Sequence, residues 1–120
     1  MGLGGSKSAG ADDHGACIAC DSPSDFEKTL SEAGSKTVFV DFTATWCPPC
    51  RMIGPKFVGF SNQYSDAVFV KVDVDKNKET SGKHGVKAMP TFMAFKNGQK
   101  IDELVGADPS KLEAMIKKHK

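Results

Sequence analysis

The segment T-V-F-V-D-F-T-A-T-W-C-P-P-C at residues 37–50 joins a predicted strand to the start of a predicted helix. Its first half is rich in β-branched and aromatic residues and is apolar on both faces except for Asp41. Such a strand is typical of a sheet that is covered by helices on both sides. The helix is predicted from Cys50 to about Tyr64, with a kink at Pro55.

Further elements are predicted on both sides of this segment. Residues 17–21 form a short, mostly apolar strand, and Ser22 then caps a helix whose first position is a proline. A second buried strand is predicted over residues 67–74, and the polar residues 76–83 favour a weak helix. These elements alternate strictly between strand and helix, which is typical of a parallel sheet.

The C-terminal part of the chain predicts a hairpin followed by a helix. Asn97-Gly98 is typical of a type I′ turn, here between strands at residues 91–96 and 100–105. Asp108-Pro109 then opens a last helix. The predicted order is β-α-β-α-β-α-β-β-α, an α/β fold with a central mixed sheet flanked by helices.

Composition limits the classes of protein to consider. With 120 residues, 39% of them hydrophobic, the chain has enough apolar material for one core, and we assign residues 17–120 to a single domain. Residues 1–16 are rich in glycine and are predicted to be a flexible N-terminal extension. A net charge of +1 argues against a nucleic-acid partner. Without a secretory signal or an apolar run of ~20 residues, we expect a cytoplasmic protein.

Two cysteines lie where the central strand ends and the helix begins, in Trp46-Cys47-Pro48-Pro49-Cys50. The positive end of the helix dipole favours a thiolate, so Cys47 is the predicted nucleophile. If Cys47 caps the helix, the two prolines carry no N–H and the amide of Cys50 remains as the donor to its sulfur. One helical turn brings Cys50 close enough to form a disulfide, which makes it the predicted resolving thiol in dithiol–disulfide exchange.

Three other side chains are expected to act near these thiols. Asp41 lies on an apolar strand, so burial should raise its pKa and let it accept the proton of Cys50. Lys71, on the neighbouring strand, is either a partner that compensates the charge of Asp41 or a solvated lysine at the end of its strand. Trp46, next to the nucleophile, is predicted to form a wall of the site.

Four motifs resemble the thioredoxin family in order and spacing across Cys17 to Lys120. They are V-D-F-T-A-T-W-C-P-P-C-R-M-I-G-P, K-V-D-V-D, A-M-P-T-F and F-K-N-G-Q-K. The segment C-I-A-C-D is similar to the first strand of plant-type cytosolic (h-type) thioredoxins. The chain departs from the family at Pro48, where most thioredoxins have glycine, and this departure predicts a stiffer motif with a modestly altered redox potential.

The resemblance implies a protein-disulfide reductase of cell redox homeostasis. It implies that Met89-Pro90 is a cis peptide beside Cys47, and that extended substrate backbone binds there and along the loop Val105-Gly106-Ala107, with Pro48 and Pro49 at the edge of the groove. The expected partners are a thioredoxin reductase, which supplies the reducing equivalents, and disulfide-containing target proteins. No bound cofactor and no metal are expected, and the chain is expected to be a monomer.

The four cysteines allow other interpretations. Cys17 and Cys20 could complete a zinc site with the second pair, but the spacer is long. In a strand, residues three apart point to opposite faces with Cα atoms roughly 10 Å apart, too far for one tetrahedral metal. We therefore expect Cys20 to be buried and inert on the face of Ile18, and Cys17 to be exposed, either as a spectator or as a thiol open to glutathione or a second chain.

Two further alternatives concern function. The same fold could serve as a disulfide oxidase or isomerase, but those relatives usually have a histidine between their active-site cysteines, where this chain has prolines. A metal-binding or thiol-independent interaction module is the non-enzymatic alternative. His14, His84 and His119 are scattered and show no ligand spacing, so no function is predicted for them.

The N-terminus fits the pattern of N-myristoylation, with glycine at position 2 and serine at position 6. A flexible glycine-rich tail explains the same residues equally well. One acyl chain without a polybasic patch binds membranes weakly and reversibly. If Gly2 is acylated, we expect a fraction of the protein at a membrane surface.

Overall fold

The computed structural model describes residues 15–120. The predicted acylation of Gly2, and all of the predicted flexible extension except its last two residues, lie outside the described residues. Within them, Ala16 donates its backbone N–H to Ser61 Oγ at 3.1 Å, so contacts with the folded domain begin before Cys17. No helix among residues 15–120 is long and apolar enough to cross a membrane.

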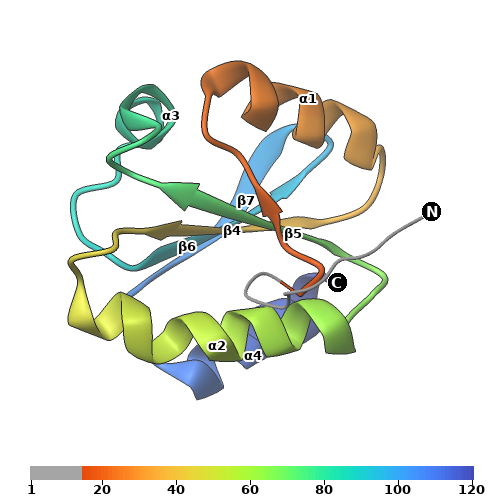
Figure 1. The fold of residues 1–120 in the computed structure, drawn as a ribbon. Coiled ribbons are helices and arrows are strands. Elements are labelled where there is room, and N and C mark those ends of the chain that lie inside the picture. Colours follow the sequence, from red (N-terminus) through yellow and green to blue (C-terminus); the bar gives the residue numbers. More distant parts are fainter. Residues whose placement is uncertain (1–14) are drawn as a thin grey trace.

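A five-stranded mixed sheet forms the centre of the molecule, in the order β3-β5-β4-β6-β7 (Figure 1). The strands β3, β5 and β4 run parallel, and β6 and β7 are antiparallel to their neighbours. The observed bounds are β3 (Ile18–Ala19), β4 (Val38–Thr43), β5 (Val68–Asp73), β6 (Thr91–Lys96) and β7 (Gln99–Val105). The predicted element order and the mixed sheet are confirmed.

Helices cover both faces of the sheet (Figure 1). The helices α1 (Pro23–Ala33) and α3 (Lys78–Lys83) lie on one face, and α2 (Pro48–Gln63) and α4 (Pro109–His119) lie on the other. Each face has its own apolar core, because β4 is the central strand and its alternate side chains point to opposite faces. Phe39 belongs to the core beneath α2 and α4, and Val40 belongs to the core beneath α1.

The predicted helix caps are confirmed. Ser22 accepts the N–H of Asp25 at 3.1 Å, and Asp108 accepts the N–H groups of Ser110 and Lys111 at 3.0 and 3.1 Å. Each of these caps satisfies backbone donors that have no partner inside the helix. Because capping is a local interaction, it could be predicted from short motifs.

The start of α2 was predicted too late in the chain. The helix begins at Pro48 rather than at Cys50. The first turn of a helix makes no use of its own N–H groups, so two successive prolines can occupy its first positions without losing a hydrogen bond. Cys47 is therefore the N-cap residue, with extended backbone angles (φ −101°, ψ 109°).

The predicted hairpin turn is confirmed, since Asn97 and Gly98 have φ angles of 53° and 78°. The strand after the turn begins at Gln99, slightly earlier than predicted, and the pairing of β6 with β7 shifts register between Ala94 and Phe95. This hairpin carries the end of β7 back to the start of β6, because Thr91 is paired with Val105. The residues predicted to bind substrate before the start of β6 and around the end of β7 therefore meet at one edge of the sheet.

Candidate active site

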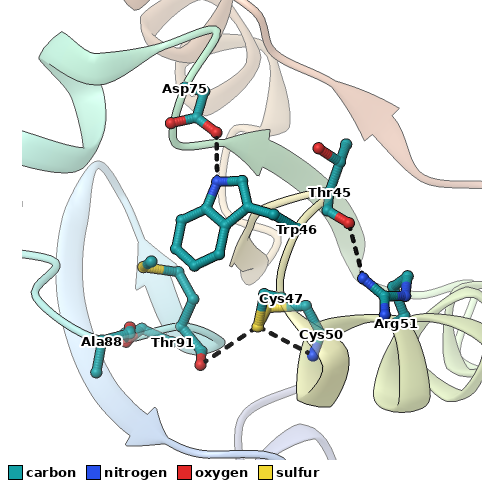
Figure 2. Close-up of a disulfide and its surroundings, with 9 residues drawn as sticks. Thr45, Trp46, Cys47, Cys50, Arg51, Asp75, Ala88 and Thr91 are labelled. Atoms are coloured by element: carbon teal, nitrogen blue, oxygen red, sulfur yellow. Dashed lines mark hydrogen bonds between the residues drawn. A yellow bond between two sulfur atoms is a disulfide. The ribbon is translucent and has the colours of Figure 1, made fainter.

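Cys47 and Cys50 form a disulfide at the N-terminus of α2 (Figure 2). Their Cα atoms are 5.2 Å apart, and both residues are buried. The backbone N–H of Cys50 donates to Cys47 Sγ at 3.2 Å. This is the contact predicted from the two prolines, and it places a fixed donor beside the sulfur that would carry the negative charge in the reduced protein.

The loop before β6 lies against the sulfur of Cys47. The Met89-Pro90 peptide bond is cis, as the resemblance implied, and the carbonyl oxygen of Met89 lies 3.7 Å from Cys47 Sγ. Gly106 donates its N–H to the carbonyl oxygen of Pro90 at 2.9 Å, which brings the segment 105–107 to the same loop. The residues predicted to bind substrate in these two segments are therefore neighbours, and Val105 exposes 56% of its surface there.

Trp46 lies beside the disulfide and is 60% exposed (Figure 2). Its indole N–H donates to the carboxylate of Asp75 at 2.7 Å. Sequence reasoning missed Asp75. The signal was present, because β4 and β5 are parallel and the residues after their carboxyl ends meet at the same edge of the sheet. One ring edge of Trp46 is thus anchored while its face remains open to a bound protein.

Replacement of Asp75 by Ala should loosen Trp46 and weaken binding of protein substrates. Loss of one exposed hydrogen bond should weaken the free energy of substrate binding by about 0.5–1 kcal/mol, so we expect KM for a protein disulfide to rise roughly two- to fivefold. kcat for a small aromatic disulfide should not change. Since the chain has 1 tryptophan, its fluorescence anisotropy reports this ring alone. Asp75→Asn keeps an acceptor oxygen and is the matched control; unchanged anisotropy in Asp75→Ala would contradict the anchoring role.

Asp41 is buried on β4 with 1% of its surface exposed. Neither of its carboxylate oxygens has a hydrogen-bond partner among residues 15–120. Burial raises the pKa of Asp41 to about 7, and the positive charge of Lys71 opposes that rise. A carboxyl group with this pKa can both accept and release a proton near neutral pH, as the predicted role requires.

Lys71 is paired with Asp41 in the register of β4 and β5, so the two side chains project from the same face of the sheet. Lys71 lies within β5 and is half-buried, which places it away from the strand end that the alternative interpretation assumed. It lines a cavity of about 680 Å³, together with Cys50, Gly54 and Val58 of α2. This cavity is large enough for water, and it connects Cys50 to the lysine beside Asp41.

The expected exposure of Cys17 was wrong. Cys17 is partly buried and packs against the core beneath α2 and α4, and burial raises the pKa of its thiol. Cys20 is fully buried in the core beneath α1, as predicted, with its sulfur 3.5 Å from Thr29 Oγ1. The two thiols thus face opposite sides of the sheet. Among residues 15–120, no group of three or more His, Cys, Asp and Glu side chains is arranged around a common metal position.

Comparison with known proteins gives the same family in sequence and in structure. The thioredoxin family model matches residues 18–118. Thioredoxin-1 of Schizosaccharomyces pombe is 62% identical over 82 residues, which are 68% of this chain and 80% of that protein. The thioredoxin of Equus caballus is 53% identical over 97 residues, 81% of this chain and 92% of that protein.

Solved structures of thioredoxins superpose closely on the fold. A thioredoxin from Nicotiana alata matches with a TM-score of 0.87 at 36% identity and covers 93% of this chain and 99% of its own. A mutant of a poplar thioredoxin h matches with a TM-score of 0.84 at 34% identity and covers 87% and 82% of the two chains.

Proposed function

Because this chain belongs to the thioredoxin family and is therefore a protein-disulfide oxidoreductase, we propose that Cys47 is its nucleophile and Cys50 its resolving thiol. The observation that carries this assignment is the arrangement of the disulfide. Cys47 caps α2 and accepts the N–H of Cys50, and its sulfur faces the carbonyl of Met89 in the loop before β6. Dithiol–disulfide exchange needs one accessible thiolate and a second thiol within bonding reach.

The reaction begins when the Cys47 thiolate attacks a target disulfide. A bond forms between Cys47 Sγ and one target sulfur, and the other target sulfur leaves as a thiolate and takes up a proton. Cys50 then loses its proton and attacks Cys47 Sγ, which releases the second target sulfur as a thiolate. Two electrons have passed to the target, and the chain holds the Cys47–Cys50 disulfide.

Asp41 is proposed to accept the proton of Cys50 during the second step. The carboxyl group is buried, carries a pKa of about 7, and lies on the strand that leads to the active-site turn. Lys71 is proposed to stabilise the carboxylate form, with water in the adjoining cavity carrying the proton to solvent. Trp46, Pro48, Pro49, Met89-Pro90 and the segment 105–107 are proposed to contact the polypeptide on either side of the target disulfide.

We propose further that the chain is a cytosolic thioredoxin of the plant h type, recycled by a thioredoxin reductase. The C-I-A-C-D segment and the structural likeness to thioredoxins of Nicotiana alata and poplar support the subtype. The protein is proposed to act as a monomer on many disulfide-containing targets. Acylation of Gly2 is proposed to add a weak, reversible association with membranes to a mainly cytoplasmic distribution.

A coupled assay tests the proposed function. Insulin is reduced in the presence of NADPH and an NADPH-dependent thioredoxin reductase, and consumption of NADPH is followed at catalytic concentrations of the protein. We expect multiple turnovers per molecule. If the reductase leaves the Cys47–Cys50 disulfide oxidised but a ferredoxin-dependent reductase reduces it, the exchange chemistry stands and the electron donor is ferredoxin. If neither reductase nor dithiothreitol supports insulin reduction, the proposed function is wrong.

A further inference from the structure

His84 lies at the C-terminus of α3, with its ring among three phenylalanines. The ring centroids of Phe26, Phe42 and Phe95 are 5.5, 6.3 and 5.2 Å from that of His84. These phenylalanines come from α1, β4 and β6, so a single imidazole contacts three elements of the core beneath α1. No function was predicted for this histidine from the sequence, because the contacts that define its surroundings are distant in the chain.

The imidazole is held in a setting that favours its neutral form. Its Nε2 atom is buried and has no hydrogen-bond partner in the part of the chain that the structure describes. Protonation would place a charged N–H group where nothing accepts it. Burial lowers the pKa of His84, the positive charges of Lys83 on α3 and Lys100 on β7 lower it further, and Glu27 on α1 raises it. From β4 and β6 the facing side chains are aromatic.

The chain between His84 and the cis peptide is held by short-range contacts. His84 itself closes α3, since its backbone N–H bonds to the carbonyls of Thr80 and Gly82. Val86 donates its N–H to the carbonyl oxygen of Ser81 at 3.0 Å and packs against the same core as the imidazole. Further along, the carbonyl of Ala88 accepts the hydroxyl of Thr91 at 2.6 Å. Four residues of chain separate His84 from Met89, whose carbonyl lies beside Cys47 Sγ.

We propose that His84 is a positioning residue for the Met89-Pro90 loop, and that its neutral imidazole anchors the loop in the conformation that receives substrate. This inference rests on the proposed function in one respect, namely that the loop contacts the target polypeptide. In the closed conformation the imidazole lies in the phenylalanine cluster. When His84 is protonated, it leaves the cluster and the protein enters an open conformation, in which the end of α3 is loosened and the loop is mobile. Binding of substrate in the groove then depends on pH through His84, a residue outside the pair Cys47 and Cys50.

The direction of the effect follows from proton linkage. In the closed conformation the pKa of His84 is below its ordinary value of 6.5, and in the open conformation it returns to that value. The open conformation therefore binds more protons, and its population increases as the pH falls below about 6.5. At a pH one unit below this value, the open fraction can rise by up to about tenfold.

Amide hydrogen exchange in the oxidised protein tests the positioning role without any substrate. After correction for intrinsic exchange rates, protection of the Gly85 and Val86 amides, which bond to the carbonyls of Gly82 and Ser81, should fall in the wild type by up to about tenfold between pH 7.5 and pH 5.5. His84→Phe keeps an aromatic ring but cannot titrate, so its protection should be the same at both pH values. His119→Gln removes another histidine and is the matched control, and it should behave like the wild type.

A negative result in this exchange experiment can be told apart from failure of the proposed function, because the experiment involves no catalysis. Equal protection at both pH values in the wild type, or a pH effect that persists in His84→Phe, would overturn the positioning role and leave the exchange chemistry intact. If His84→Phe fails to fold, an NMR titration of the wild-type imidazole decides the matter. We expect the Met89 amide resonance to shift with the pKa of His84, and a constant Met89 resonance would contradict the proposal.

Steady-state kinetics then connect the loop to substrate binding. KM for a protein disulfide should rise on acidification in the wild type and not in His84→Phe, whereas KM for a small aromatic disulfide should not depend on residue 84. Titration of Asp41 affects the resolving step for both kinds of substrate, so it cannot produce a difference between them. Equal pH profiles of the two KM values in the wild type would overturn the link to the groove.

Discussion

Cys50→Ser is expected to stop turnover and to trap target proteins as mixed disulfides on Cys47. The first attack needs only the Cys47 sulfur, which keeps its position at the start of α2 and the N–H donor of residue 50. The second attack needs the Sγ atom of Cys50, and a serine hydroxyl cannot displace a thiolate from a disulfide. Turnover in the coupled insulin assay should fall by at least about a hundredfold, as for loss of other groups that form or resolve a covalent intermediate.

The trapped species can be measured directly. Non-reducing electrophoresis or intact-mass analysis should show one target chain per molecule of Cys50→Ser, released by dithiothreitol. Cys47→Ser should be inactive without forming an adduct at position 50, because only Cys47 Sγ contacts the Met89 loop, whereas Cys50 lines the cavity beside Lys71. Cys17→Ser is the matched control for loss of a partly buried thiol and should retain activity. Normal turnover by Cys50→Ser would show that another group resolves the intermediate.

The parts of the fold that could be predicted from the sequence are those fixed by local chemistry. The cap formed by Ser22 and the turn at Asn97-Gly98 each depend on a few successive residues, and both are confirmed. The same holds for the first turn of α2, where two prolines leave only the N–H of Cys50 to meet Cys47 Sγ. Only the start of that helix was misplaced, by two residues, since the helix begins at Pro48 and its first turn accepts both prolines.

The parts that could not be predicted depend on packing between distant segments. Cys17 was expected to be exposed because it lies on the face of its strand opposite Cys20. The alternation of side chains assigns a residue to a face of the sheet, but it does not say whether helices cover that face, as α2 and α4 do here. Asp75 becomes a partner of Trp46 only when β4 and β5 lie side by side. His84 follows a polar segment, and its aromatic surroundings come from three separate elements. Each of these contacts joins segments that are distant in the chain, so it becomes visible only when the pairing of the strands or the packing of the helices is known.

Asp41 combines a feature that local sequence predicts with one that depends on the pairing of distant segments. Its burial could be predicted, because a single acid in the apolar run at residues 38–42 must enter the core if the strand does. Lys71 could be named as a candidate partner of its carboxyl group, but the choice between a partner and a solvated lysine depends on the register of β4 with β5, which sets Lys71 opposite Asp41. The structure leaves both carboxylate oxygens without a partner among residues 15–120, so the charged form is costly. Because the buried carboxylate destabilises the folded protein, its removal should have a large effect on the free energy of unfolding.

Asp41→Asn is expected to stabilise the oxidised protein at pH 8 by roughly 4 kcal/mol, which is the free energy that corresponds to a pKa raised from 3.8 to about 7. The folded wild type holds a proton that the unfolded chain has already lost. Its stability is therefore full below pH 3.8 and declines as the pH rises toward 7, by about 1.4 kcal/mol per pH unit. Urea unfolding from pH 4 to pH 8 should show this decline in the wild type and not in Asp41→Asn.

The same substitution should slow catalysis while it stabilises the fold. Without a proton acceptor, decay of the mixed disulfide is expected to slow by roughly a hundredfold, and its rate should lose the rise with pH around pH 7 that the pKa of Asp41 predicts for the wild type. Quenched-flow analysis of the mixed disulfide gives this rate separately from the first attack by Cys47, which should be nearly unchanged.

Asp102→Asn is the matched control for the change in stability. Hydrogen bonding to His119 lowers the pKa of Asp102, so the stability it contributes is present at neutral pH and is lost on acidification, opposite to Asp41. Its removal should therefore weaken the fold slightly at pH 8 and leave decay of the mixed disulfide unchanged. A stabilised Asp41→Asn variant with wild-type decay kinetics would confirm the burial cost of the carboxylate but exclude Asp41 as the proton acceptor, because the two effects arise from the same buried group by separate physical routes.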